Sequence, residues 1–279
     1  MTGRMEGKVA VVTGGGNGIG RACCLRYAEE GAAIVAADLQ ADQAAETARM
    51  VTDAGGRATS IGVDVTSIAD NDAMADLAVS EFGGLDAVLT AAGITHANYV
   101  SGDLEAEVKR MTRQLDYVER PGWDFVEADP DEWDTVMAVN VKGTLLSMQS
   151  CVARMLDAGT GGTVVTIASI AAKHPDAGPL AYTTSKAGVW MLTKKAARML
   201  GPVGIRVNAI GPGFIDTHMT KVIDMIPDEQ RRVDFYGQIP LGRKGVPLEI
   251  ANTALFLSND ESSYFSGEIL HPDGGFFTE

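Results

Sequence analysis

The chain contains 279 residues, of which 46% are hydrophobic, and its 37 acidic and 23 basic residues give a formal net charge of -14. A chain of this length can form one large core, so we expect a single domain covering residues 1–279. The negative charge repels nucleic acids and anionic lipid surfaces, so neither is expected as a partner.

The N-terminal region and the cysteines indicate a cytoplasmic protein. The first apolar stretch, residues 9–12, is short and strand-like rather than typical of a signal peptide, and no run approaches the length of a membrane span. Cys23, Cys24 and Cys151 offer neither a disulfide framework nor a Cys-x-x-Cys site. The four histidines lack the spacing of metal ligands, so no metal is expected.

Short runs rich in β-branched residues or alanine alternate with segments of helical periodicity, such as residues 18–30 and 42–54. A repeated strand–helix order predicts an α/β fold, with a doubly wound parallel sheet covered by helices on both faces. The ligand site of such a sheet lies at the carboxyl ends of its strands, where the winding reverses. The predicted strands, about seven in number, cover residues 9–13, 33–38, 59–63, 87–90, 164–168, 206–210 and 267–270.

Residues 94–130 form an inserted segment longer than a βα loop requires. After a candidate N-cap at Ser101, apolar residues at steps of four and three predict an amphipathic helix. Packing on the body of the subunit, a lid over the active site and a subunit contact all remain open for it. The apolar positions are Leu104, Val108, Met111, Leu115 and Val118.

A glycine-rich turn, Thr13-Gly14-Gly15-Gly16-Asn17-Gly18-Ile19-Gly20, follows the first predicted strand and leads into a helix. Glycines at this junction let the backbone approach a pyrophosphate, whose charge is met by the free N–H groups of the helix N-terminus. A turn that merely connects strand and helix would use the same residues. Gly14, Asn17, Gly18, Ile19 and Gly20 are therefore candidate dinucleotide ligands.

Asp38 ends the second predicted strand, 18 residues after Gly20, near the spacing at which a carboxylate binds the adenosine ribose. A carboxylate there repels a 2′-phosphate, and neither Asn17 nor Leu39 supplies a compensating cation, which favours NAD over NADP. An ordinary turn or N-cap role for Asp38 is the alternative. Asp64 and Val65, after the third strand, are expected near the adenine.

Tyr182 and Lys186 lie four residues apart in a helix-compatible stretch, so their side chains share one face. At about 4 Å and an effective dielectric of about 20, their attraction is worth roughly 4 kcal/mol, enough to lower the phenol pKa by about two units before desolvation of the phenolate takes some of that back. Such a phenol would act as a general acid/base near neutral pH, although the same spacing also occurs on helix surfaces. Ser169, at the end of a predicted strand, would hold a substrate oxygen beside Tyr182 or serve only as a turn residue.

Together these residues resemble the short-chain dehydrogenase/reductase family, in its single-domain branch of this length. The resemblance covers nearly the whole chain and implies a Rossmann-type fold and hydride transfer between NAD and a secondary alcohol or ketone. It also implies a homotetramer or a homodimer. The residues that carry it are Thr13-Gly14 to Gly20, Asp38, Asp64, Ala92-Gly93, Asn140, Ser169, Tyr182, Lys186, Pro212-Gly213 and Thr217.

The resemblance implies a role for each matched position. Tyr182 would exchange a proton with the substrate oxygen, to which Ser169 hydrogen-bonds. Lys186 would bind the nicotinamide ribose and lower the pKa of the tyrosine, and Asn140 would interrupt its helix and bind a water linked to Lys186. The remaining cofactor contacts would come from Ala91, Ala92, Gly93, Pro212, Gly213, Ile215 and Thr217.

One departure from the family pattern concerns the sheet. Where the family has Asn-Asn-Ala-Gly, this chain has Thr90-Ala91-Ala92-Gly93, so a side-chain amide that braces the central sheet is missing. Any contact of Ala91 to adenosine is then made by its backbone. The second departure is the inserted segment 94–130, which exceeds the usual length.

Residues 217–243 would cover the substrate, and their apolar set suits an uncharged or hydrophobic small molecule, or else packs two short helices. The C-terminal Phe276-Phe277 would be a subunit contact or pack on its own subunit. Two further functions stay open, a catalytically silent NAD-binding regulator and a cofactor-retaining epimerase or dehydratase. The apolar set is Met219, Val222, Ile223, Met225, Ile226, Phe235 and Tyr236.

Overall fold

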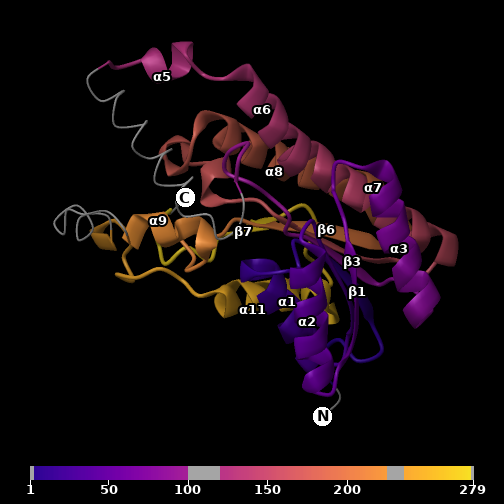
Figure 1. Cartoon of the computed structure of the whole chain (residues 1–279). Helices are drawn as coiled ribbons and strands as arrows, with labels where there is room; N and C mark the ends of the chain where they lie inside the picture. The colour runs from indigo at the N-terminus through magenta and orange to yellow at the C-terminus, as the bar shows by residue number, and fades with distance from the viewer. Residues whose placement is uncertain (1–2, 100–119, 225–235, 278–279) are drawn as a thin grey trace.

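A computed structural model describes residues 3–99, 120–224 and 236–277 of the chain (Figure 1). Within these ranges, seven strands form one parallel sheet in the order β3-β2-β1-β4-β5-β6-β7, which confirms the predicted fold class. The strands are β1 (Val9–Thr13), β2 (Ala33–Asp38), β3 (Arg57–Gly62), β4 (Ala87–Thr90), β5 (Gly162–Ile167), β6 (Ile205–Ile210) and β7 (Ile269–Leu270). The last is shorter than predicted because it pairs with β6 at two positions only.

Helices cover both faces of the sheet: α1, α2 and α11 lie on one side and α3, α7 and α8 on the other (Figure 1). The described helices are α1 (Gly18–Glu29), α2 (Ala41–Asp53), α3 (Ile68–Phe82), α5 (Trp123–Val126), α6 (Pro130–Met137), α7 (Thr144–Ala158), α8 (Leu180–Leu200), α9 (Lys221–Asp224) and α11 (Pro247–Ser258). A π-helical turn, η2 (Ala138–Gly143), joins α6 to α7. Short 3-10 turns are η3 (Ile170–Ala172), η4 (Pro175–Ala177), η5 (Gly201–Val203), η6 (His218–Thr220) and η7 (Asp260–Ser262).

The central strand β1 divides the core into two layers because successive side chains of a strand point to opposite faces. Val9 and Val11 pack in the cluster that contains residues of α3, α7 and α8. Ala10 and Val12 pack in the cluster that contains residues of α1 and α11. All five residues of β1 are buried, and its first four are apolar, so the strand does not alternate between apolar and polar residues.

The winding of the sheet reverses at β1, which pairs with β2 on one side and β4 on the other. The connections that leave the carboxyl ends of β1 and β4 therefore diverge, one toward α1 and the other toward residues 91–99. A crevice opens between diverging connections of this kind, and ligands of doubly wound sheets bind there.

The inserted segment is described only at its ends. The predicted apolar stripe from Leu104 to Val118 lies outside the described residues, so its three suggested roles stay open. On the far side, α5 is exposed, and Asp129 caps α6 by accepting a hydrogen bond from Asp131 N. Of the helices that the structure describes, none has the length and apolar character that crossing a bilayer demands.

Thr90 begins the segment in which the side-chain amide of the family pattern is missing. It lies in β4 between Thr13 of β1 and Thr166 of β5, and its hydroxyl is buried with no hydrogen-bond partner among the described residues. The hydroxyl of Thr166, by contrast, hydrogen-bonds to that of Thr193 at 2.7 Å. An unpaired buried hydroxyl destabilises the folded state.

We predict that Thr90→Val, which keeps the shape and removes the unpaired hydroxyl, raises the free energy of unfolding by about 1 kcal/mol. Thr166→Val is the matched control, because it removes a satisfied hydroxyl from the neighbouring strand and should destabilise the protein by about 1 kcal/mol. Urea unfolding of the three proteins measures both changes. Equal losses of stability in the two variants would contradict the prediction.

Candidate active site

The glycine turn brings the backbone of β1 against the segment that follows β4. Gly14 has a φ of +65°, and a Cβ there would lie 2.7 Å from Ala92 N. A Cβ at Gly20 would lie 2.0 Å from the carbonyl oxygen of Gly14, so the first turn of α1 packs directly on the loop. Only glycine fits either position.

The N-terminus of α1 is open toward the crevice. Asn17 makes no side-chain capping bond to the helix and instead donates to Gln43 Oε1 at 2.8 Å. The first N–H groups of a helix have no partner within the helix, so those of Gly18, Ile19 and Gly20 are suited to an anion. All three residues line the adjoining cavity.

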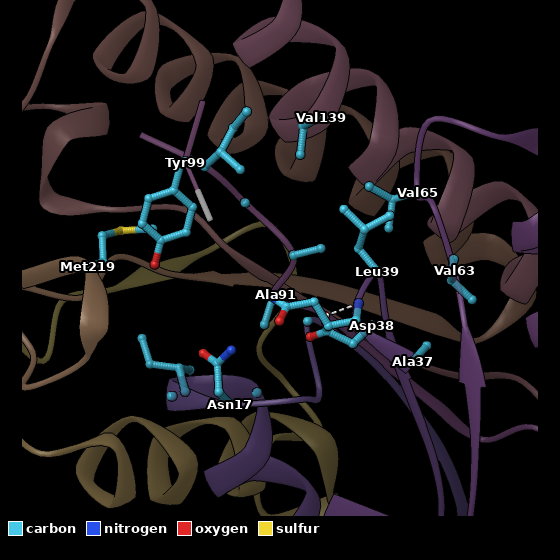
Figure 2. Close-up of a pocket in the computed structure, with 18 of the residues that line it drawn as sticks. Asn17, Ala37, Asp38, Leu39, Val63, Val65, Ala91, Tyr99, Val139 and Met219 are labelled. Carbon is cyan, nitrogen blue, oxygen red and sulfur yellow. Dashed lines mark hydrogen bonds between the residues drawn. The ribbon is translucent and has the colours of Figure 1, made fainter. Parts of the chain in front are cut away.

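Asp38 lies at one end of this cavity, and Tyr99 with Met219 at the other (Figure 2). The Asp38 carboxylate accepts hydrogen bonds from Gly16 N and Gln40 N, both at 2.9 Å, one on each oxygen. A carboxylate has about four acceptor sites, so two remain for hydroxyl donors. Asp38 therefore does serve as a turn residue, the alternative reading, and still has capacity for a ribose.

The cavity beside the glycine turn has a volume of about 290 Å³ and adjoins a second one of about 250 Å³. The two share Ile19, Ala91, Gly93, Thr217 and Met219 and so form one cleft. Every predicted cofactor residue lines one or both of them. The first also contains Gly14, Asn17, Gly18, Gly20, Asp38, Leu39, Asp64, Val65 and Ala92, and the second contains Ser169, Tyr182, Lys186, Pro212, Gly213 and Ile215.

Tyr182 and Lys186 lie in the first turns of α8 and face the second cavity. The Lys186 Nζ is 5.6 Å from the centroid of the Tyr182 ring and donates to the carbonyl oxygen of Ile167 at 2.9 Å. Only 5% of Lys186 is exposed. Its ammonium reaches into the cleft beside Gly93, where a Cβ would lie 3.3 Å from Nζ.

Ser169 follows β5 and begins η3, where its Oγ accepts a hydrogen bond from Ala171 N at 3.1 Å. It is thus a turn residue as well as a wall of the cleft. Ser169 lies near enough to Tyr182 to affect its pKa, and both side chains line the second cavity.

The pKa of Tyr182 is shifted opposite to the predicted direction. Desolvation raises the pKa of Tyr182 above its ordinary value near 10, against an opposing effect of the Ser169 hydrogen bond. Burial also lowers the pKa of Lys186 to about 8. The prediction that the lysine lowers the tyrosine pKa by about two units is wrong for the protein alone, because burial of the Tyr182 phenol disfavours its charged form.

Asn140 lies outside the cleft lining and connects its two sides. It occupies the π-helical turn η2, which confirms the predicted interruption of its helix. Its Oδ1 accepts from Ile94 N at 2.8 Å, and its Nδ2 donates to Ile94 O and Ser185 Oγ, both at 2.9 Å. The water link to Lys186 stays a prediction.

Several cleft residues carried no sequence signal. Tyr99 belongs to the inserted segment, where periodicity pointed only to residues after Ser101, yet it lines the cavity near Met219. Phe214 lies between the predicted residues Gly213 and Ile215, and a phenylalanine at this position is equally typical of a core. Contacts made after folding, rather than local spacing, bring these side chains to the cleft.

Metal ligands do not gather in the part of the chain that the structure describes: no three His, Cys, Asp or Glu side chains there come together in a way suited to a metal ion. Cys23, Cys24 and Cys151 are all buried free thiols. Burial raises the pKa of Cys24 and Cys151 to about 12, so neither is a ready nucleophile.

Known proteins resemble this chain over nearly its whole length. A family model described as enoyl-(acyl carrier protein) reductase matches residues 14–277. The 2,5-dichloro-2,5-cyclohexadiene-1,4-diol dehydrogenase LinX of Sphingobium indicum is 36% identical over 277 residues, covering 99% of this chain and 98% of the relative. The 3-oxoacyl-(acyl-carrier-protein) reductase FabG of Thermotoga maritima is 34% identical over 275 residues, and the (3R)-3-hydroxyacyl-CoA dehydrogenase of Rattus norvegicus 33% identical over 283 residues, each alignment covering 98% of both chains.

Lys186→Met tests the cost of burying the amine. Because the pKa of Lys186 is lowered from 10.5 to about 8 on folding, the unfolded chain holds this proton more tightly. The wild type therefore carries a penalty below about pH 8 that disappears as the pH rises to about 10.5, and the variant carries none. Between about pH 8 and pH 10.5, the free energy of unfolding of the wild type should rise by up to about 3 kcal/mol relative to that of Lys186→Met.

Urea unfolding at a series of pH values between about 7 and 10.5 measures this difference. Lys195→Met, which removes an exposed amine from the same helix, serves as the control and should stay parallel to the wild type. A pH-independent difference between the wild type and Lys186→Met would contradict the prediction.

Proposed function

Because the chain belongs to the short-chain dehydrogenase/reductase family, and so is an oxidoreductase that transfers hydride between a nicotinamide cofactor and a hydroxyl-bearing or carbonyl carbon, we propose that it is an NAD-dependent dehydrogenase of uncharged secondary alcohols. The observation that carries this proposal is that Ser169, Tyr182 and Lys186 together line the second cavity, which adjoins the cavity beside the glycine turn. A silent regulator would have no use for this assembly, and no observation favours an epimerase or dehydratase.

Tyr182 is the general acid/base of the proposed reaction. In alcohol oxidation Tyr182 first gives up its phenolic proton, which its raised pKa opposes, and then accepts the hydroxyl proton, while Ser169 hydrogen-bonds to the substrate oxygen and keeps it beside the phenol. The cofactor, when bound, supplies the hydride acceptor. In the reverse direction the Tyr182 hydroxyl donates its proton to the carbonyl oxygen.

Lys186 and Asn140 support this proton transfer. A lysine whose pKa is about 8 exchanges its proton near neutral pH, so Lys186 is suited to relay charge away from Tyr182 as well as to bind a ribose hydroxyl. Asn140 positions the catalytic helix through Ser185, the residue directly before Lys186. The relay then leads from Tyr182 through Lys186 toward the π-helical turn.

NAD rather than NADP is the proposed cofactor because the ribose end of the cleft is acidic. The Asp38 carboxylate faces this end, Leu39 is 74% exposed, and no Lys or Arg is found among the described residues that line the cavity. The nearest basic side chain of α1, Arg21, is engaged by Thr47 and Glu46. A 2′-phosphate would meet repulsion there without a compensating cation.

The substrate is proposed to be an uncharged small molecule because Lys186 is the one charged residue among the described residues lining the second cavity. Met219 and Ile223 of the predicted apolar set line it, while Tyr236 donates to Asp224 Oδ1 at 2.5 Å instead. The side chain of Val222 and all of Met225, Ile226 and Phe235 lie outside the described residues. A relative named for a chlorinated cyclohexadienediol supports a compact cyclic or aliphatic alcohol.

The wider setting completes the proposal. We take residues 1–279 as one nucleotide-binding domain with an inserted segment at 94–130 and a substrate-covering segment at 217–243. Three buried free thiols support a cytoplasmic location, where thiols stay reduced. The family supports a homo-oligomer, either a dimer or a tetramer.

Tyr182→Phe removes the proposed acid/base and should lower turnover by about 10²–10⁴-fold, because general acid/base groups contribute this much. NADH absorbance with a panel of aliphatic, cyclic, steroid and sugar alcohols measures turnover, and calorimetry measures NAD binding, which should stay near the wild-type value. Tyr264→Phe, which alters a fully exposed phenol, is the control. Substantial residual turnover in Tyr182→Phe would refute the assignment.

Asp38→Asn tests cofactor choice, since it keeps the shape and removes the charge that opposes a 2′-phosphate. The ratio of kcat/KM for NADP to that for NAD should rise about 10- to 100-fold, equivalent to roughly 1.4–2.7 kcal/mol. Asp53→Asn removes the same charge at the far end of α2 and should leave the ratio unchanged. Equal ratios in both variants would mean that Asp38 does not select the cofactor.

A further inference from the structure

Phe214 separates the substrate half of the cleft from a third cavity. This third cavity has a volume of about 170 Å³, and Phe214 and Ile215 are the two residues that it shares with the substrate half. Ile215 is buried to 4% exposure in the core that also contains α1 and α11, so it belongs to the fixed scaffold. The ring of Phe214 is the remaining partition.

The two cavities differ in chemical character. The substrate half is lined by neutral described residues apart from Lys186. The third cavity is lined in part by Arg243 and Glu249, which are paired at 2.7 Å, and by Asp273. Phe214 therefore stands at a boundary between an uncharged space and a charged one.

Phe276 packs against the ring of Phe214 and supports it. Its ring packs edge-to-face on Phe214, with centroids 5.2 Å apart and an interplanar angle of 83°. On another side it meets His174 at 5.3 Å, in the loop that follows Ser169. The C-terminal Phe276-Phe277 thus packs on its own subunit, one of the two roles predicted from the sequence.

The terminal turn that carries Phe276 is fixed by Asp273. This side chain is 8% exposed, and its two oxygens accept hydrogen bonds from Gly275 N and Phe277 N, both at 2.9 Å. Phe277 packs against His271 with centroids 5.6 Å apart. Phe276 is therefore presented to Phe214 by an ordered segment.

The backbone of Phe214 is equally constrained. Its carbonyl oxygen accepts from Gly245 N at 2.9 Å, and Asp216 N donates to Gly245 O at 2.8 Å. A Cβ at the preceding Gly213 would lie 2.6 Å from the Cα of Asp273, so the loop touches the terminal turn directly. With the backbone held, the edge-to-face contact with Phe276 helps to set the position of the Phe214 ring.

We propose that Phe214 is a specificity-determining wall that limits the enzyme to compact secondary alcohols, and that Phe276 is the positioning residue that keeps this wall closed. The inference rests on the proposed function and names its substrate class more narrowly. Removal of the Phe214 ring joins the substrate half to the third cavity and gives a longer chain room to extend. Removal of the Phe276 ring takes away the edge-to-face support of Phe214 and loosens the wall.

The test is the chain-length profile of kcat/KM for 2-alkanols from 2-butanol to 2-decanol, with cyclohexanol as the compact reference and NAD as cofactor. Phe214→Ala should raise the ratio for 2-decanol over cyclohexanol by about 10-fold or more, since pocket shape discriminates methylene groups by such factors. Phe276→Ala should raise it in the same direction by about 3-fold, with the KM for NAD unchanged. A general loss of stability would lower all substrates together and leave the ratio alone.

Phe265→Ala is the matched control. Phe265 packs on Phe256 with centroids 5.4 Å apart at 78°, so this variant removes an aromatic pair of similar geometry away from the cleft, and its profile should match the wild type. If Phe214→Ala does not fold, Phe214→Leu and Phe276→Ala carry the same test. If these variants and the wild type have the same chain-length profile, Phe214 does not determine specificity, although the proposed dehydrogenase activity still holds. If the wild type turns over no secondary alcohol, the proposed function itself is wrong.

Discussion

The buried amide of Asn140 is the interaction on which the cleft depends. It is 1% exposed and bonds at once to both backbone polar groups of Ile94 and to the hydroxyl of Ser185. Ile94 continues the segment that floors the cofactor cavity, and Ser185 lies between Tyr182 and Lys186. One side chain therefore fixes the catalytic helix relative to the dinucleotide site, and the π-helical turn is the local distortion that lets it reach both.

The cleft provides local positive potential in a chain whose net charge is negative. A protein with a formal charge of -14 has to attract an anionic dinucleotide, and the first-turn N–H groups of α1 supply the attraction locally. At the opposite end, burial favours the neutral forms of Tyr182 and Lys186. Groups with perturbed pKa values are suited to pass a proton rather than to hold a fixed charge.

Specificity and chemistry occupy different parts of the fold. The proposed acid/base group lies on α8, and Ser169 directly follows β5, both set by the rigid sheet. The proposed wall, Phe214, lies in a loop and is held by the last turn of the chain. Separation of this kind lets the substrate change while the catalytic geometry stays fixed.

The sequence by itself determined the parallel sheet, the glycine turn with Asp38 beside it, and the shared helical face of Tyr182 and Lys186, because each follows from local periodicity or short spacing. Tertiary structure alone decided the direction of the tyrosine and lysine pKa shifts, since these depend on how much water the folded chain excludes. It also decided the partners of Asn140 and the contact of Phe214 with Phe276. Those contacts join segments far apart in the chain, where no repeating pattern records which side chains will meet.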